Sequence, residues 1–91
     1  MFQLTGFQRD LLFVIEGLAD PHGLAIKDEL EAVYDEEINH GRLYPNLDDL
    51  VEMGYVAKGT KDDRTNEYTL TAAGETLVQD RHAWEQDRMD A

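Results

Sequence analysis

The spacing of apolar residues constrains the fold of this chain most, because it changes twice along the sequence. Before Gly54, apolar residues recur every three or four positions, whereas the segment from Tyr55 to Thr71 is rich in Val, Thr and Tyr. From Ala72 onward the three-to-four spacing returns. The first spacing is typical of amphipathic helices, and β-branched and aromatic enrichment is typical of strands. The chain is predicted to fold as helix, helix, helix, β-hairpin, helix.

Three amphipathic stripes lie before Gly54. Thr5 is a plausible N-cap for the first helix, residues 20–23 end it, and its stripe is Phe7, Leu11, Val14, Ile15 and Leu18. The second helix carries Ile26, Leu30, Val33 and Tyr34. The third has Asn39 as its cap, Gly54 as its C-terminal glycine, and Leu43, Leu47, Leu50 and Met53 as its stripe. These stripes predict a core between the three helices.

Pro45 lies within the third stripe and leaves two alternatives for that helix. Proline is tolerated in the first turn of a helix, but further inside it removes a backbone hydrogen bond and meets the carbonyl four residues earlier. Either the helix begins near Arg42, or it begins at Asn39 and is bent where Pro45 meets the Gly41 carbonyl.

The remainder of the chain predicts a hairpin and a last helix. Residues 55–60 and 65–71 are the two strands, and the turn-prone residues 61–64 join them. The last helix places Leu77, Arg81, Trp84 and Arg88 on one line. The fold class is α+β and mostly α, in a single domain. Three helices followed by a two-stranded hairpin outline a winged helix-turn-helix.

Size and composition restrict the class of protein. A 91-residue chain buries only a little over ~60% of its unfolded surface, so help from a partner subunit is favoured. The absence of cysteine excludes disulfides and thiolate sites, and it fits a reducing cytosol. The longest apolar run, Leu11 to Ile15, is far shorter than the ~20 residues of a spanning helix, and no signal core follows Met1. We expect a cytoplasmic protein without membrane contact.

Charge is the most unusual part of the composition. The chain has 20 acidic and 8 basic residues, a net charge of −12. In molar salt the Debye length falls to ~3 Å, so like charges on such a surface hardly repel. The composition predicts adaptation to a very salty cell, with a generic acidic protein as the alternative.

A set of motifs in the central part of the chain resembles the PadR family of transcriptional regulators. The family's recognition helix reads roughly Gly-x-Leu-Tyr-Pro-x-Leu, followed by Leu-x-x-x-Gly, a wing and a Tyr-x-Leu-Thr-x-x-Gly exit. The matching residues here are Gly41, Arg42, Leu43, Tyr44, Pro45, Asn46, Leu47, Leu50, Gly54, Tyr55, Arg64, Tyr68, Leu70, Thr71 and Gly74. The match covers about two-thirds of the chain in the correct order and spacing. With the acidic composition, it suggests a PadR-like regulator of a halophilic archaeon.

This resemblance implies a dimeric regulator, often a repressor, whose C-terminal helix packs on the partner subunit. Residues 1–74 are then the winged-helix DNA-binding domain, and residues 75–91 are the dimerisation helix of the same domain. The chain departs from the family in two respects: Asp48, Asp49 and Glu52 stand where basic residues are usual, and the C-terminal segment is short. We therefore expect a compact homodimer in which Phe2, Leu4, Leu77 and Trp84 form the interface. The alternative is that the last stripe covers its own subunit.

Candidate DNA contacts lie on the third helix and the hairpin. Arg42 is placed to reach guanine edges or a phosphate, and Asn46, one turn later, to reach adenine. The Tyr44 hydroxyl is a candidate phosphate contact, and the wing suits sequence-independent phosphate contacts through Lys58, Lys61 and Arg64. Residues 40–70 carry four basic and six acidic side chains, a net charge of −2, while the other sixty residues carry −10. A nearly neutral region on an acidic body favours double-stranded DNA as a partner, although each residue alone fits a structural or solvated role.

Two other classes of function were compared with DNA binding. The acidic third helix favours a winged-helix module that binds protein and not DNA, whereas the basic wing favours a DNA-binding regulator. The sequence contains no recognisable catalytic motif, and the spacing of His22, His40 and His82 matches no metal site. The sequence predicts no enzyme, cofactor or metal and identifies no small-molecule effector. Monovalent cations are candidate partners at residues 35–37 and at Asp48, Asp49, Asp62 and Asp63.

Overall fold

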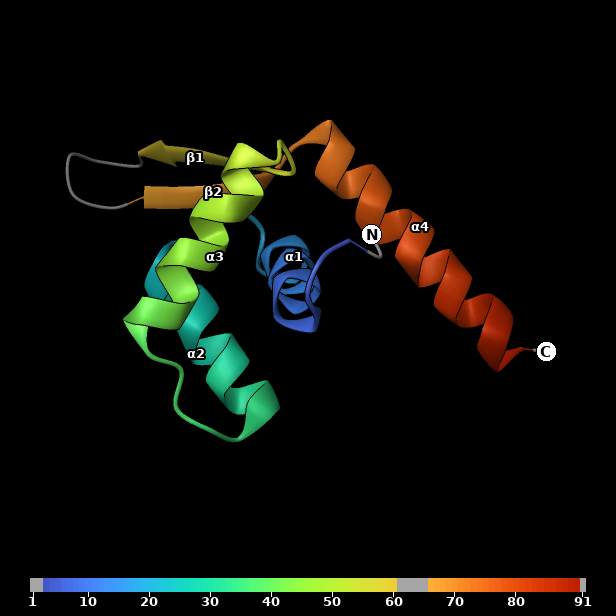
Figure 1. The fold of residues 1–91 in the computed structure, drawn as a ribbon, viewed down its shortest axis with the longest axis horizontal. Helices are drawn as coiled ribbons and strands as arrows, with labels where there is room; N and C mark the ends of the chain where they lie inside the picture. The colour runs from blue at the N-terminus through green and yellow to red at the C-terminus, as the bar shows by residue number, and fades with distance from the viewer. Residues whose placement is uncertain (1–2, 61–65, 91) are drawn as a thin grey trace.

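The computed structural model describes residues 3–60 and 66–90, and its elements follow the predicted order (Figure 1). Three helices, α1 (Gly6–Leu18), α2 (Gly23–Tyr34) and α3 (His40–Glu52), precede the hairpin of β1 (Val56–Thr60) and β2 (Asn66–Leu70). The chain ends in α4 (Ala72–Met89). The predicted fold class, mostly helical with three helices, a β-hairpin and a last helix, is confirmed. None of the helices in the described ranges is long and apolar enough to cross a membrane.

Each helix begins at a side chain that accepts a hydrogen bond from the first turn. Thr5 and Gln8 form a capping box on α1, and Asn39 accepts from the Arg42 amide at the start of α3, so both predicted caps are confirmed. Two further caps are His22, whose Nδ1 accepts from the Ala25 amide over 3.2 Å, and Thr71 at the start of α4. Capping satisfies amides that a helix cannot pair internally.

The course of α3 decides between the two alternatives for Pro45. The helix begins at the Asn39 cap and keeps Pro45 in its interior, at the sixth helical position. Because Pro45 has no amide hydrogen, it cannot donate to the Gly41 carbonyl. Gly41 and Pro45 are both exposed, so water can reach that carbonyl. Gly54 follows the helix with φ +87°, a conformation that glycine adopts readily.

The hairpin is antiparallel, with Val56 opposite Leu70 and Thr60 opposite Asn66. Its strands are slightly shorter than predicted, and the Thr71 amide donates to the Tyr55 carbonyl over 3.1 Å just beyond them. The loop before α2 joins this hairpin, since the Tyr68 amide donates to the Pro21 carbonyl over 2.8 Å. The wing is thus held to the start of α2 as well as to α3.

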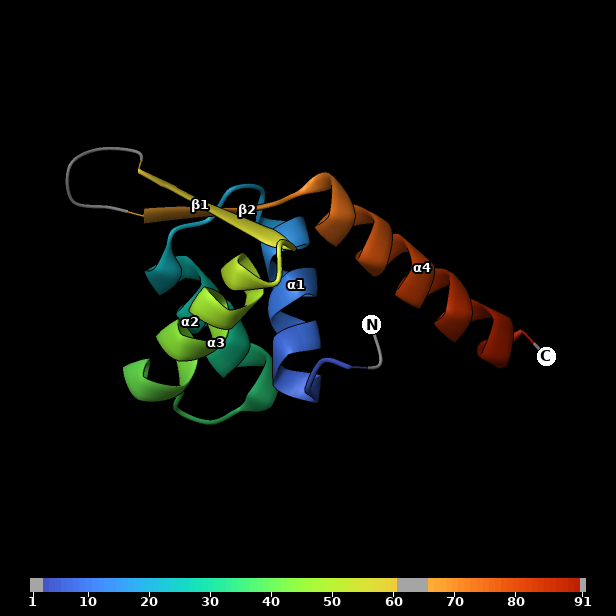
Figure 2. The same cartoon turned by 45° about the horizontal axis from the view of Figure 1, so that its top comes forward.

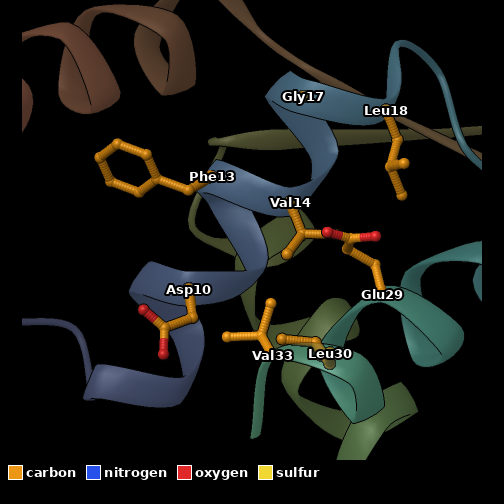
Figure 3. Close-up of a pocket in the computed structure, with 8 residues that line it drawn as sticks. All are labelled: Asp10, Phe13, Val14, Gly17, Leu18, Glu29, Leu30 and Val33. Carbon is orange, nitrogen blue, oxygen red and sulfur yellow. The ribbon is translucent and has the colours of Figure 1, made fainter.

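The buried residues of α1 differ from its predicted stripe. Leu12 is fully buried, whereas Val14 is only partly buried and Leu18 is 37% exposed. Helix α1 packs against α2, α3 and β2, so its buried face is wider than the single predicted stripe. This face includes Leu12 and leaves Val14 and Leu18 at its edge. Those two side chains lie instead beside α2 at the surface (Figure 3).

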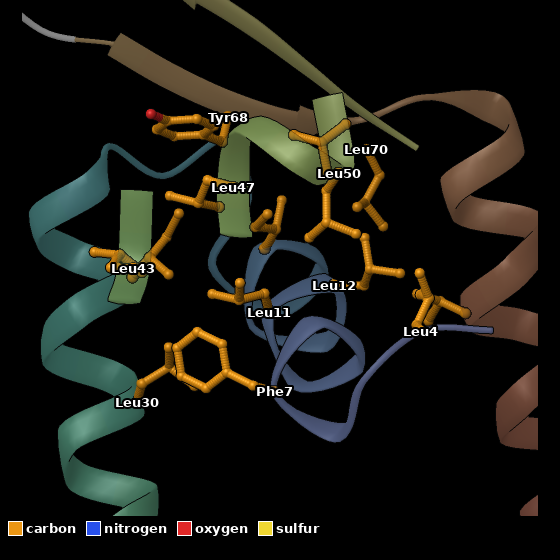
Figure 4. Close-up of a cluster of buried hydrophobic side chains, with 14 of the residues drawn as sticks. Leu4, Phe7, Leu11, Leu12, Leu30, Leu43, Leu47, Leu50, Tyr68 and Leu70 are labelled. Atoms are coloured by element: carbon orange, nitrogen blue, oxygen red, sulfur yellow. The ribbon is translucent and has the colours of Figure 1, made fainter. Parts of the chain in front are cut away.

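The core lies where α1 meets α3 and the hairpin (Figure 4). Leucines of α1 and α3 are fully buried there, and Tyr68 of β2 covers one side with 1% exposure. The fully buried leucines are Leu11, Leu12, Leu30, Leu43, Leu47 and Leu50. This packing fixes α3 on α1 through its leucine face and leaves the opposite face of α3 outside.

Helix α4 starts on the body and then leads away from it (Figures 1 and 2). Gly74 is buried, and a Cβ there would lie 2.1 Å from the Tyr55 carbonyl oxygen, so a glycine is needed where α4 meets the hairpin. Val78, one turn later, is 6% exposed. The predicted division between residues 74 and 75 falls inside this helix, so α4 begins as part of the winged-helix body. The distal half of α4 leads away from the other three helices (Figure 2). Trp84 belongs to this half.

Candidate nucleic-acid interface

The outward face of α3 is the first component of the candidate interface. Leu43, Leu47 and Leu50 bind this helix to the core, so the residues on its other side remain in solvent. The exposed residues of α3 are His40, Gly41, Arg42, Pro45, Asp48, Asp49 and Glu52. The outward face is therefore acidic, with no basic side chain pointing from the middle of the helix.

Arg42 is held toward α1. Its guanidinium carbon lies 4.1 Å from the centroid of the Phe7 ring, and its Nη1 lies 3.6 Å from Oε1 of Glu36. The ring attracts the cation through its negative face, and the carboxylate attracts it through its charge. The side chain is still 46% exposed, so it rests at the edge of the interface. Sequence spacing could not reveal the contact with Phe7, which comes from another helix.

Asn46 uses its amide group within the subunit. Its Nδ2 donates to the Arg42 carbonyl over 2.7 Å, and its Oδ1 accepts from Nε2 of Gln8 over 3.1 Å. Gln8 is 6% exposed and also caps α1 through its Oε1, which accepts from the Thr5 amide. Gln8 is a residue that the sequence analysis missed. The capping-box spacing of Thr5 and Gln8 is a signal that could have indicated its first contact, whereas the second contact arises only from packing.

Tyr44 lies between α3 and the start of α2. It is half-buried, and its ring meets the His40 ring edge-on with centroids 5.4 Å apart. A Cβ at Gly23 would lie 2.5 Å from the Tyr44 hydroxyl oxygen, so a glycine is needed for this close approach. The hydroxyl is thus placed beside the N-terminus of α2, where unpaired amides favour anions.

The wing supplies one described cation. Lys58 lies opposite Tyr68 in the hairpin, and its Nζ lies 3.7 Å from Oδ1 of Asp48 in α3. The two side chains are 40% and 62% exposed, so this is a solvent-screened pair that is readily exchanged for another partner. Lys61 and Arg64 lie outside the described residues, as do Asp62 and Asp63.

The segment between α2 and α3 is fixed by Glu31. Its Oε2 accepts from the Ile38 amide over 2.8 Å and from Nζ of Lys27 over 3.0 Å. The hydrogen bond from the Ile38 amide, and to a lesser extent that from Lys27, lowers the pKa of the Glu31 carboxyl. At the end of α2, burial and a hydrogen bond to Asp10 in α1 raise the pKa of Tyr34 to about 12, so its hydroxyl stays protonated and donates to that carboxylate. The Glu31 contact ties the segment before α3 to α2, and the Tyr34 contact ties α2 to α1.

The residues predicted for a dimer interface fall into three groups. Leu4 is 8% exposed and belongs to the core of its own subunit, and Leu77 packs partly against the same core. Trp84 is 36% exposed on the distal part of α4. Phe2 lies outside the described residues. Among residues 3–60 and 66–90, no three His, Asp or Glu side chains come together as metal ligands.

The chain is similar to several solved winged-helix proteins. A complex of the protein RosR, hsRosR-S1, is 53% identical, with a TM-score of 0.90 over 94% of this chain and 76% of that one. RosR of H. salinarum grown from NaBr is 54% identical, with a TM-score of 0.88 over 93% and 76%. A MarR mutant of E. coli complexed with operator DNA is 25% identical, with a TM-score of 0.76 over 90% and 56%. The expectation of a halophilic archaeal source agrees with these matches.

The family comparison agrees with the motifs of α3 and the hairpin. The comparison with curated proteins gives no match. The model of the transcriptional regulator PadR-like family matches residues 11–80, which include α3, both strands and the start of α4. The chain therefore belongs to the PadR-like family of transcriptional regulators and is a DNA-binding regulator, not an enzyme.

Proposed function

We propose that this regulator binds specific double-stranded DNA sites as a homodimer in a salty cytoplasm and represses the genes it controls. One observation carries the proposal: Lys58 of β1 lies beside the outward face of α3, with its Nζ 3.7 Å from Oδ1 of Asp48. This pair of elements is at the end of the body away from the distal part of α4 (Figure 1). A winged helix uses these two elements for the major groove and the flanking backbone. The other end is left for a second subunit.

Each contact residue has a distinct task in this proposal. Arg42 leaves Phe7 and Glu36 to reach a guanine or a phosphate, which its 46% exposure permits. Tyr44 contacts a phosphate beside the start of α2, and the wing holds the backbone through Lys58, Lys61 and Arg64. Adenine readout by Asn46 remains a prediction. It requires the Asn46 side-chain amide to give up its hydrogen bonds to Gln8 and the Arg42 carbonyl in favour of the base.

The homodimer gives the DNA contacts their two-fold geometry. A symmetric pair of α3 helices one turn of DNA apart reads half-sites ~34 Å from centre to centre. The expected interface joins Leu77 and Trp84 of α4 to α1 of the partner, with Phe2 and Leu4 near it. Size supports this, because a 91-residue domain has a modest core of its own.

Cations take part in binding at high salt. The exposed carboxylates of Asp48 and Asp49 lie on the face that approaches DNA, where they repel phosphates unless cations come between them. Potassium ions held between these carboxylates and the DNA offset the counterions that DNA binding releases.

Fluorescence anisotropy in 2 M KCl, with DNA from upstream of the regulator's own gene, tests the proposal. Submicromolar binding to that DNA and at least tenfold weaker binding to a scrambled duplex are expected. Deleting the gene should raise transcription from the bound promoter. Equal affinity for both duplexes would contradict specific recognition, and loss of transcription on deletion would contradict repression.

A further inference from the structure

Both basic side chains that the structure describes in the candidate interface are already paired with carboxylates of the same chain. Nη1 of Arg42 lies 3.6 Å from Oε1 of Glu36, and Nζ of Lys58 lies 3.7 Å from Oδ1 of Asp48. Each of the four side chains is at least 40% exposed, so DNA can reach it. A phosphate that approaches Arg42 or Lys58 therefore meets a cation whose charge a carboxylate already balances.

The Arg42–Glu36 pair is built into the fold. Glu36 lies two residues before Ile38, whose amide donates to Oε2 of Glu31 over 2.8 Å and ties this segment to α2. From the other side, the guanidinium carbon of Arg42 lies 4.1 Å from the centroid of the Phe7 ring, which attracts the cation through its face. The backbone near Glu36 and the side chain of Arg42 are each held by a contact of their own, so the two charges stay within reach of each other.

The Lys58–Asp48 pair joins the wing to α3. Lys58 lies opposite Tyr68 in the hairpin, and Tyr68 is 1% exposed, so the core fixes this part of the hairpin. Strand β1 packs against α3, which brings Lys58 beside Asp48. The same packing that positions the wing for DNA therefore also supplies its lysine with an internal anion.

The salt concentration decides which carboxylates act on these cations. The Debye length is about 3 Å in 1 M salt, so a carboxylate influences a cation there only when the two are in contact. Glu36 and Asp48 meet this condition at 3.6 and 3.7 Å. Glu52 is also exposed on α3, but it has no ion pair with any residue that the structure describes. On the candidate interface, Glu36 and Asp48 therefore differ from a carboxylate such as Glu52.

Counterions give these pairs a consequence for DNA binding. A free lysine or arginine that binds a DNA phosphate releases about 0.9 counterion, so salt weakens the contact. A paired cation binds the phosphate only by leaving its carboxylate. The carboxylate then lies bare beside the DNA polyanion and takes up a cation from solution. Because one cation is released and another is taken up, the contact hardly depends on salt.

We propose that Glu36 and Asp48 make DNA binding tolerant of salt by exchanging their cationic partners for potassium ions. Arg42 and Lys58 pass from the two carboxylates to DNA, and each carboxylate binds one potassium ion in place of the one that the DNA loses. This inference rests on the DNA contacts of the proposed function and assigns cation uptake to two individual residues, one of which, Glu36, lies outside α3.

The salt dependence of affinity tests the exchange. Glu36→Gln and Asp48→Asn each keep the shape of the side chain but release the cation, and binding is measured by anisotropy from 0.5 to 3 M KCl. Each dimer then has two phosphate contacts with ordinary counterion release, so each variant should have a log–log slope more negative than wild type by about 2. The control Glu52→Gln removes the same charge from α3 and should keep the wild-type slope. A slope of either variant equal to that of the control would overturn the exchange.

A second background shows whether each carboxylate acts through its own cation. Glu36→Gln should leave the slope unchanged when Arg42→Ala is already present, because no cation remains to be released. Asp48→Asn should likewise leave the slope unchanged in a protein with Lys58→Ala. Circular dichroism checks that all variants are folded. The same slope change in both backgrounds would mean that the carboxylates only repel DNA, and it would overturn the proposal.

NMR spectroscopy follows the release of Arg42 directly. The Phe7 ring shifts the signal of the Arg42 side chain in the free protein, and this shift should disappear when DNA binds. The Arg88 side chain, whose guanidinium carbon lies 4.4 Å from the centroid of the Trp84 ring, is the control and should keep its signal. An Arg42 signal that stays unchanged in the complex would overturn the exchange. Equal affinity for specific and scrambled DNA would count against the proposed function alone, because phosphate contacts form on both duplexes.

Discussion

The guanidinium carbon of Arg42 in α3 lies 4.1 Å from the ring centroid of Phe7 in α1. This contact joins α3 to α1 across 35 residues of sequence. Glu36, from the segment before α3, completes it with a carboxylate 3.6 Å away. Arg42 therefore has a structural task in the free protein in addition to its proposed DNA contact.

Removing Arg42 should affect both folding and DNA recognition. Arg42→Ala is expected to cost ~0.5–1 kcal/mol of stability through the lost stacking on Phe7. It should also change sequence preference by ~1–3 kcal/mol, while the double variant Lys58→Ala plus Arg64→Ala lowers affinity for all sequences. Anisotropy with specific and scrambled DNA separates the two effects, with circular dichroism to check folding and Arg9→Ala as the control. Unchanged affinity in both folded variants would refute this DNA face.

Gln8 should stabilise the attachment of α3 to α1. Gln8→Ala removes the acceptor of the Thr5 amide and the donor to Asn46, so we expect a loss of about 1–2 kcal/mol in urea unfolding. The matched control is Gln79→Ala on the exposed side of α4, which should change stability by less than ~0.5 kcal/mol. Similar values for the two variants would show that the Gln8 contacts contribute little.

The position of the Tyr44 hydroxyl can be tested from two sides. Tyr44→Phe removes the hydroxyl, and Gly23→Ala displaces it, because the new Cβ would lie 2.5 Å from its oxygen. Both changes should lower DNA affinity by about 1 kcal/mol if the hydroxyl donates to a phosphate. Gly6→Ala is the control, since its Cβ would meet only the end of the Arg9 side chain at 3.6 Å. Wild-type affinity in Tyr44→Phe would leave Tyr44 a purely structural residue.

Salt should not weaken DNA binding in the usual way. With roughly eight phosphate contacts per dimer the log–log slope would be about −7, so affinity would fall nearly eight orders of magnitude between 0.15 and 2 M salt. Cation uptake at the acidic face of α3 offsets this, and we expect affinity to stay flat or rise from 0.5 to 3 M KCl. Asp48→Ala with Asp49→Ala, and likewise Asp62→Ala with Asp63→Ala, should make the slope more negative. The control variant, Glu16→Ala with Asp80→Ala, removes the same charge elsewhere on the surface and should leave the slope unchanged. A steep fall in the affinity of the wild type with rising salt would contradict cation uptake.

Acid should loosen the segment before α3. The pKa of Glu31 is lowered from its ordinary value of 4.5, so its ionised form is the one that folding favours. Its contribution to stability is complete above pH 4.5 and is lost as the pH falls through the lower folded-state pKa. Glu31→Gln should lower the thermal midpoint at pH 7 and reduce the difference between pH 7 and pH 3. A midpoint equal to that of wild type at pH 7 would disprove the role of this carboxylate.

Local sequence patterns were enough to predict the order of helices and strands and the helix caps at Thr5 and Asn39. These features depend on local patterns: helical spacing, capping side chains and the change to strand-forming residues after Gly54. The motif from Gly41 to Leu47 was also sufficient to indicate the PadR-like family, because its residues are close in sequence and keep a fixed spacing.

The partners of the candidate functional side chains could not be predicted from local patterns, because they come from distant parts of the chain. Asn46 was expected to face DNA, yet its amide bonds to Gln8, which lies 38 residues away and is brought near by the packing of α1 on α3. Val14 and Leu18 were expected in the core, yet α1 turns them to a surface groove because its other faces bury Leu11 and Leu12. A helical period gives the width of an apolar face but not its neighbours, which depend on contacts between residues far apart in the chain.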